Sequence, residues 1–598
     1  MASWAHFKFA EEWAHENPPG TTNLISPRYY SNLNYDLFVR LPVTAAQVLE
    51  VGCGAGVLGA AYLARNPGAI YTGVELNAAV AREAAEKLSR VIVGDIESED
   101  VIVRLRALGT LFDLVVLGDV LEHLRDPWKT LRELKDLTMA GSICVTCVPN
   151  VAHWSLLVQQ LNGRWDYADQ GLLDHTHLRF FTYTSLDTAF KEAGWNVIDG
   201  TGRVFNKEDT ERALAMFRPI AASLNIPADK LDMNLSAFQW VMRATNGPVR
   251  NALQVVGIGL AKLAGCNEAR IDYPLATINT LPDMRATWGE ETVKLPPGGP
   301  GVMIYQRRYF TDERIDKQVE RLIQAGWVVV LDVDDDPTFK DWVDTDFYAF
   351  KRVHAITVSS ERLAAAVRQW NPNVMVFPNA IFELPEQRNE SLDKATLKVF
   401  FGALNRASDW EPIMDPVVDA ALATTAKLEF VVVHDSEFFD RIPDSIAKVF
   451  YPTLSHQDYL RVLAGCDIAL LPLADTEFNR MKSDLKLIEC AACGVVPICA
   501  PTVYADNPDH AKLAVFADLP EAWGKAILNL CVDPLLRQNL LAEGYAYVKA
   551  NRMHAHQAER RRQYYFRLRA ELPSLEASRR KRMQSLTWRP NSSSLAEG

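Results

Sequence analysis

Residues 48–60 read VLEVGCGAGVLGA, a run of glycines with the spacing of a nucleotide-binding turn. Two patterns overlap in it. The G-x-G-x-x-G pattern of a dinucleotide site is formed by Gly54, Gly56 and Gly59. The E-x-G-x-G-x-G pattern of an S-adenosylmethionine site is formed by Glu50, Gly52, Gly54 and Gly56. Both ligands need glycine here, because a tight strand-to-helix turn must let the ligand touch the backbone.

Acidic residues further along the chain help to separate the two ligands. The apolar runs QVLEVG, IYTGVEL, VIVGD and FDLVVLGD alternate with helical stretches, which predicts a parallel sheet whose ligands bind at the carboxyl ends of the strands. Glu75 could accept hydrogen bonds from the ribose of either ligand. Asp95 suits an adenine amino group, for which a dinucleotide site has no particular need. Glu50 would oppose a pyrophosphate but suits a cationic, amino-acid-bearing ligand.

These segments resemble the class I S-adenosylmethionine-dependent methyltransferases. VLEVGCGAG is similar to their glycine-rich motif, VEL and GDIE to their ribose and adenine contacts, and GDVLEHLRDP to their fourth strand. The resemblance continues to about residue 246, where SAFQWVMRAT is similar to the last strand. It implies a methyltransferase domain over residues 1–246. The cofactor-binding candidates are Glu50, Gly52, Gly54, Gly56, Glu75, Asp95, Ile96 and Asp119. The alternative is an NAD-linked sugar-modifying enzyme, which would bind NADH at the same turn.

The segment LLDHTHLRFF contains two candidate catalytic residues, His175 and His177. A histidine beside the acceptor could take the proton of its hydroxyl group as the methyl group moves. Hydrogen bonding of the pair to loop backbone is an equally good interpretation. For His123 in LEHLRD we expect a structural or cofactor-shaping role.

The sequence predicts no metal site. Cys144 and Cys147 lie on a predicted strand and point to opposite faces, so they cannot chelate one ion together. Cys490 and Cys493 have no second Cys or His pair at finger-like spacing. The acids of VLDVDDDP, residues 330–337, could bind a hard cation, but we favour a structural or acceptor-facing role.

The second half of the chain contains two further runs of alternating strands and helices. They are separated by VFPNAI at residues 376–381, and together they resemble the GT-B glycosyltransferases over about residues 265–570. The predicted fold class is therefore α/β, a Rossmann-like methyltransferase domain followed by a GT-B pair of Rossmann-like domains. The expected boundaries are 247–300 for a linker and the start of the second half, 301–385 and 386–570 for the two GT-B domains, and 571–598 for a basic, partly disordered tail.

The stretch LLPLADTEFNRMKSDLKLIECAACGVVPI is similar to the donor-sugar signature of that superfamily. Placed on one helix, its polar residues Asn479, Lys482, Ser483, Lys486 and Glu489 fall in an arc of about 120°. An ordinary amphipathic surface helix would show the same arc. As a site, it would place Lys482, with Arg406 after FFGAL, against the diphosphate of a nucleotide sugar. The resemblance implies that Glu489 binds the nucleotide ribose.

One departure from the donor-sugar signature leaves the stereochemistry of transfer open. Many retaining members carry a first glutamate where this chain has Met481, so the sugar contact could pass to Asn479 or Ser483. The missing acid also keeps open a GT-B module that has lost catalysis and only binds a glycan or a partner.

Bulk composition limits the partners and the compartment. The net charge of -12 argues against nucleic-acid binding by the chain as a whole, and nine cysteines without disulfide-framework spacing suit a reducing compartment. The basic segment between Arg560 and Arg582 could lie on the inner face of a membrane, or it could pack its aromatic side on the GT-B halves. We expect a cytoplasmic, bifunctional enzyme of bacterial surface-polysaccharide biosynthesis that acts on a glycan or lipid-linked glycan acceptor.

Overall fold

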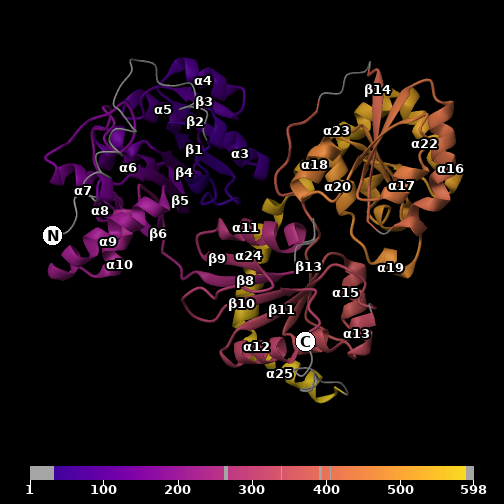
Figure 1. Cartoon of the computed structure of the whole chain (residues 1–598). Coiled ribbons are helices and arrows are strands. Elements are labelled where there is room, and N and C mark those ends of the chain that lie inside the picture. The colour runs from indigo at the N-terminus through magenta and orange to yellow at the C-terminus, as the bar shows by residue number, and fades with distance from the viewer. Residues whose placement is uncertain (1–32, 261–266, 339, 389–393, 405, 587–598) are drawn as a thin grey trace, which may run out of the picture. The chain divides into compact units, whose positions relative to one another are not determined.

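The computed structural model describes residues 33–260, 267–338, 340–388, 394–404 and 406–586. The chain forms two compact units (Figure 1). The first consists mainly of residues up to Asn251, and the second mainly of residues from Ala252 onward.

The first unit is built on a seven-stranded sheet with the order β3-β2-β1-β4-β5-β7-β6. All neighbouring strands pair in parallel except β7, which lies antiparallel between β5 and β6. The strands are β1 (Gln47–Val51), β2 (Ile70–Glu75), β3 (Arg90–Val93), β4 (Phe112–Gly118), β5 (Thr138–Pro149), β6 (Asn196–Arg203) and β7 (Gln239–Thr245). The helices are α2 (Tyr35–Phe38), α3 (Val57–Arg65), α4 (Ala78–Ala85), α5 (Glu99–Ala107), η2 (Leu121–His123), α6 (Pro127–Asp136), α7 (Trp154–Leu161), α8 (Tyr183–Glu192), α9 (Lys207–Ser223) and α10 (Ala228–Ser236).

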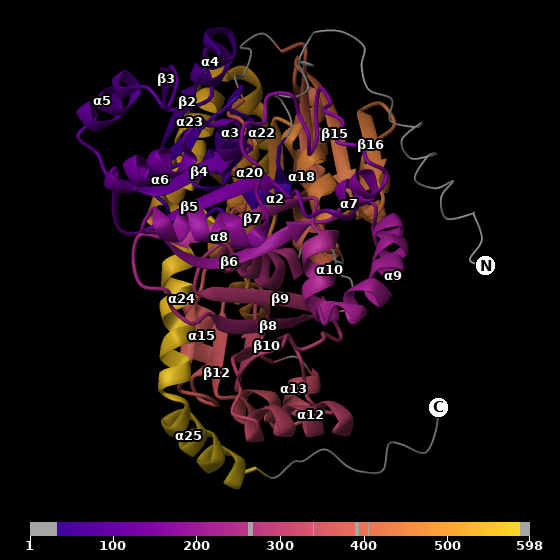
Figure 2. The same ribbon diagram turned by 90° about the vertical axis from the view of Figure 1, so that its left-hand side faces the viewer.

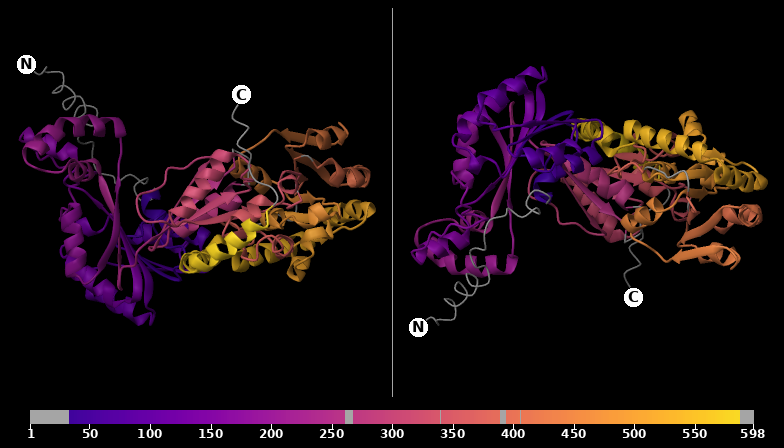
Figure 3. Two further views of the ribbon diagram at one scale, coloured as in Figure 1. Left: turned by 90° about the horizontal axis from the view of Figure 1, so that it is seen from below. Right: turned by 90° about the horizontal axis from the view of Figure 1, so that it is seen from above.

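Both faces of this sheet are covered, as the views from below and above show (Figure 3). Successive residues of a strand point to opposite faces, and here they enter two different hydrophobic clusters. Leu49 and Val115 join the cluster that includes residues of α5, α6 and α8, whereas Val48 and Val116 join the one that includes residues of α2, α3 and α4. Two buried faces explain why β1 and β4 read as nearly continuous apolar runs.

The central strands β3, β2, β1 and β4 place four loops at one edge of the sheet. Because neighbouring parallel strands run in the same direction, the loops at their carboxyl ends lie side by side. These loops are residues 52–56, 76–77, 94–98 and 119–120. They carry most of the predicted cofactor residues.

The second unit contains two six-stranded parallel sheets. The sheet of its N-terminal half has the order β13-β12-β11-β10-β8-β9. Its strands are β8 (Leu253–Gly259), β9 (Met284–Glu290), β10 (Val302–Gln306), β11 (Val328–Val333), β12 (Ala355–Val358) and β13 (Val374–Val376). Its helices are η3 (Glu268–Asp272), α11 (Tyr273–Asn279), α12 (Glu313–Gln324), α13 (Lys340–Asp344), α14 (Tyr348–Arg352) and α15 (Glu361–Val367). Residues 253–290, which fall in the segment expected to hold a linker and the start of the second half, add two strands to this sheet.

The C-terminal half of the second unit has the strand order β16-β15-β14-β17-β18-β19. The strands are β14 (Thr396–Gly402), β15 (Lys427–Val433), β16 (Ala447–Tyr451), β17 (Ile468–Leu471), β18 (Val496–Cys499) and β19 (Val515–Phe516). The helices are α16 (Ala407–Ala423), α17 (Ser436–Arg441), α18 (His456–Ala464), α19 (Glu477–Arg480), α20 (Leu485–Cys493), α21 (Pro501–Tyr504), η4 (Pro508–Lys512), α22 (Pro520–Val532) and α23 (Pro534–Asn551).

The chain ends in two helices, α24 (His554–Ala570) and α25 (Leu572–Gln584), which run along the N-terminal half of the second unit (Figures 1 and 2). Tyr564 and Tyr565 of α24 are buried. Several arginines of these helices have partners in that half: Arg562 pairs with Asp283, and Arg582 donates to the carbonyl of Val353 at 2.7 Å. This packing occupies much of the basic segment. Membrane association through this segment stays a prediction. Among the described residues no helix is long and apolar enough to cross a bilayer.

Candidate active sites

The turn after β1 contains three glycines in the left-handed region of backbone space. Gly52, Gly54 and Gly56 have φ angles of 69°, 53° and 76°, which residues with a Cβ rarely adopt. A Cβ on Gly52 would also lie 2.8 Å from Cγ2 of Val120, in the loop after β4. The predicted tight turn is therefore present, and it brings the loops after β1 and β4 into contact.

Glu75 at the end of β2 holds this turn. Its two carboxylate oxygens accept hydrogen bonds from the backbone N–H of Gly54 at 3.0 Å and of Asn77 at 2.9 Å. A carboxylate acceptor makes both bonds stronger than a neutral one would. The carboxylate thus connects the first two loops, and its contact with a ribose stays a prediction.

Glu50 lies in β1, just before the turn. Its surroundings differ from the charged site that we expected. Its side chain is buried and accepts a hydrogen bond from the hydroxyl group of Tyr71 at 3.0 Å. Burial, with the nearby charge of Glu75, raises the pKa of Glu50 to about 8, although the Tyr71 hydrogen bond opposes the rise. At neutral pH the carboxyl group is therefore mostly uncharged. The contact of Glu50 with a sulfonium stays a prediction, because a bound cation would itself lower the pKa of this carboxyl group.

The loops after β3 and β4 are tied together by Glu97. Its carboxylate accepts hydrogen bonds from the backbone N–H of Arg125 at 3.0 Å and of Asp126 at 2.7 Å. Beside it, Asp95 accepts from the N–H of Glu97 at 2.9 Å, and Ile96 is buried in a core cluster. The predicted adenine acceptor Asp95 thus sits in a fixed loop at the carboxyl edge.

Asp119 ends β4 in a left-handed conformation, with φ of 53°. Burial raises its pKa to about 6, although Arg203 and a hydrogen bond from Gln239 oppose the rise. Of the other residues of this loop, Glu122 and His123 were not counted among the cofactor candidates. The sequence feature that could have identified both is the segment LEH, which comes directly after the predicted fourth strand.

The two candidate catalytic histidines lie in different surroundings. His175 is exposed and stacks on Tyr167, with ring centroids 5.9 Å apart. His177 is buried, and its ring meets that of His123 edge-on at 4.9 Å. Burial lowers the pKa of His177, which keeps its imidazole neutral and able to accept a proton or a metal ion. The structure thus brings only His177 to the carboxyl edge beside the β4 loop.

His177, His123 and Glu122 form a cluster that could hold a divalent cation. Each offers a ligand atom within 4.8 Å of the others. The Nδ1 atom of His177 lies 3.2 Å from the carbonyl of Leu172, and that of His123 lies 3.2 Å from the carbonyl of Thr176. A carbonyl only accepts, so Nδ1 carries the proton and Nε2 keeps its lone pair.

Glu122 adds independent support for a cation. It is 1% exposed, and within the described part of the chain neither of its carboxyl oxygens has a hydrogen-bond partner. Burial and the neighbouring Asp119 raise its pKa well above the ordinary value. A buried carboxyl without partners is costly, and a bound cation would relieve that cost. Two imidazoles and a carboxylate suit a first-row divalent ion. This cluster is therefore a candidate metal site that the sequence did not predict.

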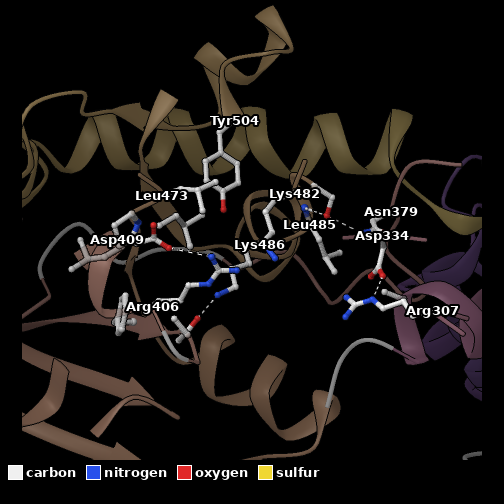
Figure 4. A pocket seen from close by; sticks show the side chains of 18 residues that line it. Arg307, Asp334, Asn379, Arg406, Asp409, Leu473, Lys482, Leu485, Lys486 and Tyr504 are labelled. Carbon is white, nitrogen blue, oxygen red and sulfur yellow. Dashed lines mark hydrogen bonds and ion pairs between the residues drawn. The ribbon is translucent and has the colours of Figure 1, made fainter. Parts of the chain in front are cut away.

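The second candidate site is a pocket of about 220 Å³ between the two halves of the second unit (Figure 4). Its N-terminal wall includes Arg307, Asp334 and Asn379. Its C-terminal wall includes Arg406, Lys482, Ser483 and Lys486. Four of these seven side chains are cationic, and they come from segments far apart in the sequence. Such a pocket can take a polyanionic ligand.

The cations of the C-terminal wall are held by other polar groups. Lys482 Nζ lies 2.7 Å from Asp335 and 4.4 Å from the ring centroid of Phe478. Lys486 donates to the carbonyl of Gly402. Burial, with the positive charge of Arg406, lowers the pKa of Lys486 to about 8. An anion bound in the pocket would relieve this unfavourable charge, which gives the site a preference for phosphate-like groups.

The prediction of one helix from Asn479 to Glu489 is wrong. Helix α19 ends at Arg480 and α20 begins at Leu485, with a turn between them. Tertiary partners hold that turn: Asn379 donates to Ser483 Oγ at 2.8 Å, and Arg552 donates to Asp484 at 2.8 Å. The common polar arc therefore does not exist, although Lys482, Ser483 and Lys486 all still line the pocket.

Asn479 and Glu489 do not line this pocket. Asn479 is buried, receives a hydrogen bond from Arg406 at 2.9 Å and donates to Asp409 at 2.8 Å. Glu489 is buried 2.8 Å from Nε2 of His456. Asn479 therefore positions Arg406, whereas a ribose contact of Glu489 stays a prediction.

The pocket residues that were not predicted include Arg307, Asn379 and Asp409. Asn379 belongs to the VFPNAI segment that the sequence marked as the crossover between the two halves. Arg307 directly follows β10, where a carboxyl-end loop could have been suspected. Nothing in the local sequence singles out Asp409, which becomes informative only through its contacts with Asn479 and Arg406.

The fold and the two sites define a transferase with a methyltransferase domain and a glycosyltransferase-like domain. A family model described as a methyltransferase domain matches residues 26–199, and one described as glycosyl transferase-like matches residues 417–563. An enzyme named ubiquinone biosynthesis O-methyltransferase from Dinoroseobacter shibae is 30% identical over 193 residues, which cover 31% of this chain and 75% of that protein. A protein of the same name from Cereibacter sphaeroides is 29% identical over 211 residues, 34% of this chain and 82% of its own length.

Solved structures are similar only at a low level. An S-adenosylmethionine-dependent methyltransferase from Mesorhizobium loti has a TM-score of 0.24 and 14% identity, over 35% of this chain and 96% of its own. An O-methyltransferase family protein from Burkholderia thailandensis also has a TM-score of 0.24, with 12% identity, over 41% of this chain and 60% of its own. The chain belongs to the methyltransferase family through its first unit, and it carries a glycosyl transferase-like domain in its second.

Proposed function

We propose that the first unit transfers a methyl group from S-adenosylmethionine to an acceptor oxygen, and that this acceptor belongs to a sugar. The observation that carries the site is the set of loops joined by Glu75 and Glu97 at the carboxyl edge of β1–β4. S-adenosylmethionine supplies the methyl group. His177 would take the proton of the acceptor hydroxyl group at its Nε2. If Nε2 held a cation instead, the cation would lower the pKa of the hydroxyl group and another base would take the proton.

Titration calorimetry of the full chain with S-adenosylhomocysteine tests the cofactor, and mass analysis of products from a panel of oligosaccharides and catechols tests the acceptor. We favour a sugar as the acceptor because the second unit, on the same chain, is glycosyl transferase-like. A catechol-type acceptor is the second candidate, because the relatives are named ubiquinone biosynthesis O-methyltransferases. Methylation of catechols without methylation of any glycan would contradict the sugar proposal.

We further propose that the second unit transfers a sugar from a nucleotide donor to a growing glycan. The convergence of Arg406, Lys482 and Lys486 on one pocket carries this proposal, since a nucleotide sugar leaves its diphosphate with negative charge. Binding of uridine and guanosine diphosphates, followed by turnover of their sugars, tests it. A module that only binds glycans would show no hydrolysis of any nucleotide sugar.

Together the two activities fit an enzyme of bacterial surface-polysaccharide biosynthesis that acts at the inner face of the membrane on a glycan or lipid-linked glycan. The support is the presence of both transferase domains on one chain. One acceptor carrying both a new sugar and a new methyl group, recovered from a reaction with both donors, would be the expected product.

A further inference from the structure

The position that would hold the first acid of a retaining donor signature is occupied by an apolar side chain. Met481 packs against the hydrophobic cluster of the N-terminal half of the second unit. The nearby Ser483 accepts a hydrogen bond from Asn379. The C-terminal wall therefore offers cations for the diphosphate, but no carboxylate at the position where retaining members have one.

Carboxylates reach this pocket from the opposite half, in the loop after β11. Its three acids have different surroundings. Asp336 is buried and accepts from the N–H and the hydroxyl group of Thr338, both at 2.7 Å, so it is used within its own loop. Asp335 pairs with Lys482. Asp334 is the one that lines the pocket.

Asp334 is also held in one orientation. Its Oδ1 lies 2.6 Å from Nε of Arg307, another residue of the same wall. Figure 4 shows this pair on one side of the pocket and Arg406 with Asp409 on the other. A sugar bound between the walls, with its diphosphate toward Arg406, Lys482 and Lys486, would have its other side toward Asp334.

We propose that Asp334 is the general base of an inverting glycosyl transfer. The acceptor hydroxyl oxygen forms a bond to the anomeric carbon from the side opposite the diphosphate. The bond between that carbon and the diphosphate oxygen breaks, and its electron pair leaves with the nucleoside diphosphate. The proton of the acceptor hydroxyl moves to a carboxylate oxygen of Asp334. The new negative charge on the diphosphate lies beside Arg406, Lys482 and Lys486.

This inference rests on the proposed glycosyltransferase function, so the test begins with the unaltered full chain. UDP-glucose, UDP-galactose and GDP-mannose are the probes, oligosaccharides are the acceptors, and the anomeric coupling in the proton NMR spectrum of the product reports the configuration. Failure of the unaltered chain to bind or turn over any nucleotide sugar would overturn the proposed function itself. Turnover with inversion is expected, and turnover with retention would overturn the role of Asp334 alone.

Variants then identify the base. Asp334→Asn should lower kcat on the order of 10²- to 10⁴-fold, the usual contribution of a general base. It should leave the affinity for the nucleoside diphosphate within about threefold, because the amide fills the same volume and lies on the N-terminal wall, whereas Arg406, Lys482 and Lys486 line the C-terminal wall. The acidic limb of the kcat–pH profile should disappear as well. Asp344→Asn is the matched control, since Asp344 is an exposed acid on α13 of the same half. Unchanged kcat in Asp334→Asn, with inversion intact, would assign the base to another group.

Discussion

At the scale of single residues, Glu50 shows how burial changes what an acid can do. Its carboxyl group titrates near about 4.3 in the unfolded chain, whereas burial raises its pKa to about 8 in the fold. At a pH between these two pKa values, the carboxyl group has released its proton in the unfolded state but keeps it in the folded state. The stability of the fold therefore falls as pH rises through this window, and it levels off above about 8.

Glu50→Gln should remove that dependence. We expect the free energy of unfolding of the variant to exceed that of the unaltered chain by an amount that grows with pH, up to about 3 kcal/mol near neutral pH at 1.36 kcal/mol per pKa unit. Urea unfolding at several pH values measures it. Affinity for S-adenosylmethionine should stay within about threefold, because the group is already uncharged. A large loss of affinity for S-adenosylmethionine but not for S-adenosylhomocysteine would support the charged contact with the sulfonium.

The cluster of Glu122, His123 and His177 should bind a divalent cation. After dialysis against a chelator, titration calorimetry with zinc should give a saturable site near one ion per chain, whereas magnesium should bind weakly. Glu122→Gln and His177→Gln should each weaken it at least about tenfold, because each removes a ligand. His175→Gln serves as the control, since His175 is exposed and lies outside the cluster. Equal loss in the control would contradict the assignment.

At the scale of elements, α18 and α20 are connected by His456 and Glu489. Burial alone would lower the pKa of His456, but the hydrogen bond and charge of Glu489 raise it above the ordinary value. A raised histidine pKa gives stability that is fully present below about pH 6.5 and is lost as pH rises through the folded value. The pair thus holds the donor-signature helix most firmly in mildly acidic solution.

His456→Gln should remove this contribution. The difference in unfolding free energy between the unaltered chain and the variant should be largest at about pH 6 and shrink at higher pH. Thermal unfolding across that range checks it. A difference that stays constant with pH would mean that the histidine acts only by packing. His434→Gln is a suitable comparison, because burial lowers the pKa of His434 and no acid of the described residues pairs with it.

The sequence predicted most strands of both units, because apolar runs between polar turns identify buried parallel strands directly. It failed where tertiary contacts decide the local structure. The helical arc over residues 479–489 could not reveal that Asn379 and Arg552, more than 60 residues away on either side, hold the turn at 483–484. The spacing of Glu50 before the turn also could not reveal that its side chain is buried beside Tyr71.

At the scale of the whole molecule, the chain joins two units that each have their own sheets and core clusters. Every residue assigned to the methyl-transfer site lies in the first, and every residue assigned to the donor pocket lies in the second. If each unit carries its own chemistry, a substitution in one site should leave the other activity intact, because additivity holds for sites that share no partners.

Lys482→Ala should lower nucleotide-sugar turnover at least about 100-fold, since it removes a cation beside the leaving diphosphate, while the rate of methyl transfer stays within about twofold. Glu75→Gln should do the reverse. It removes one of the two carboxylate oxygens that hold the Gly54 turn, so affinity for S-adenosylhomocysteine should fall about tenfold or more. Both activities are measured on the same preparations, with thermal unfolding as a control for folding. A fall of both activities in either variant, without loss of stability, would mean that the two sites are coupled rather than separate.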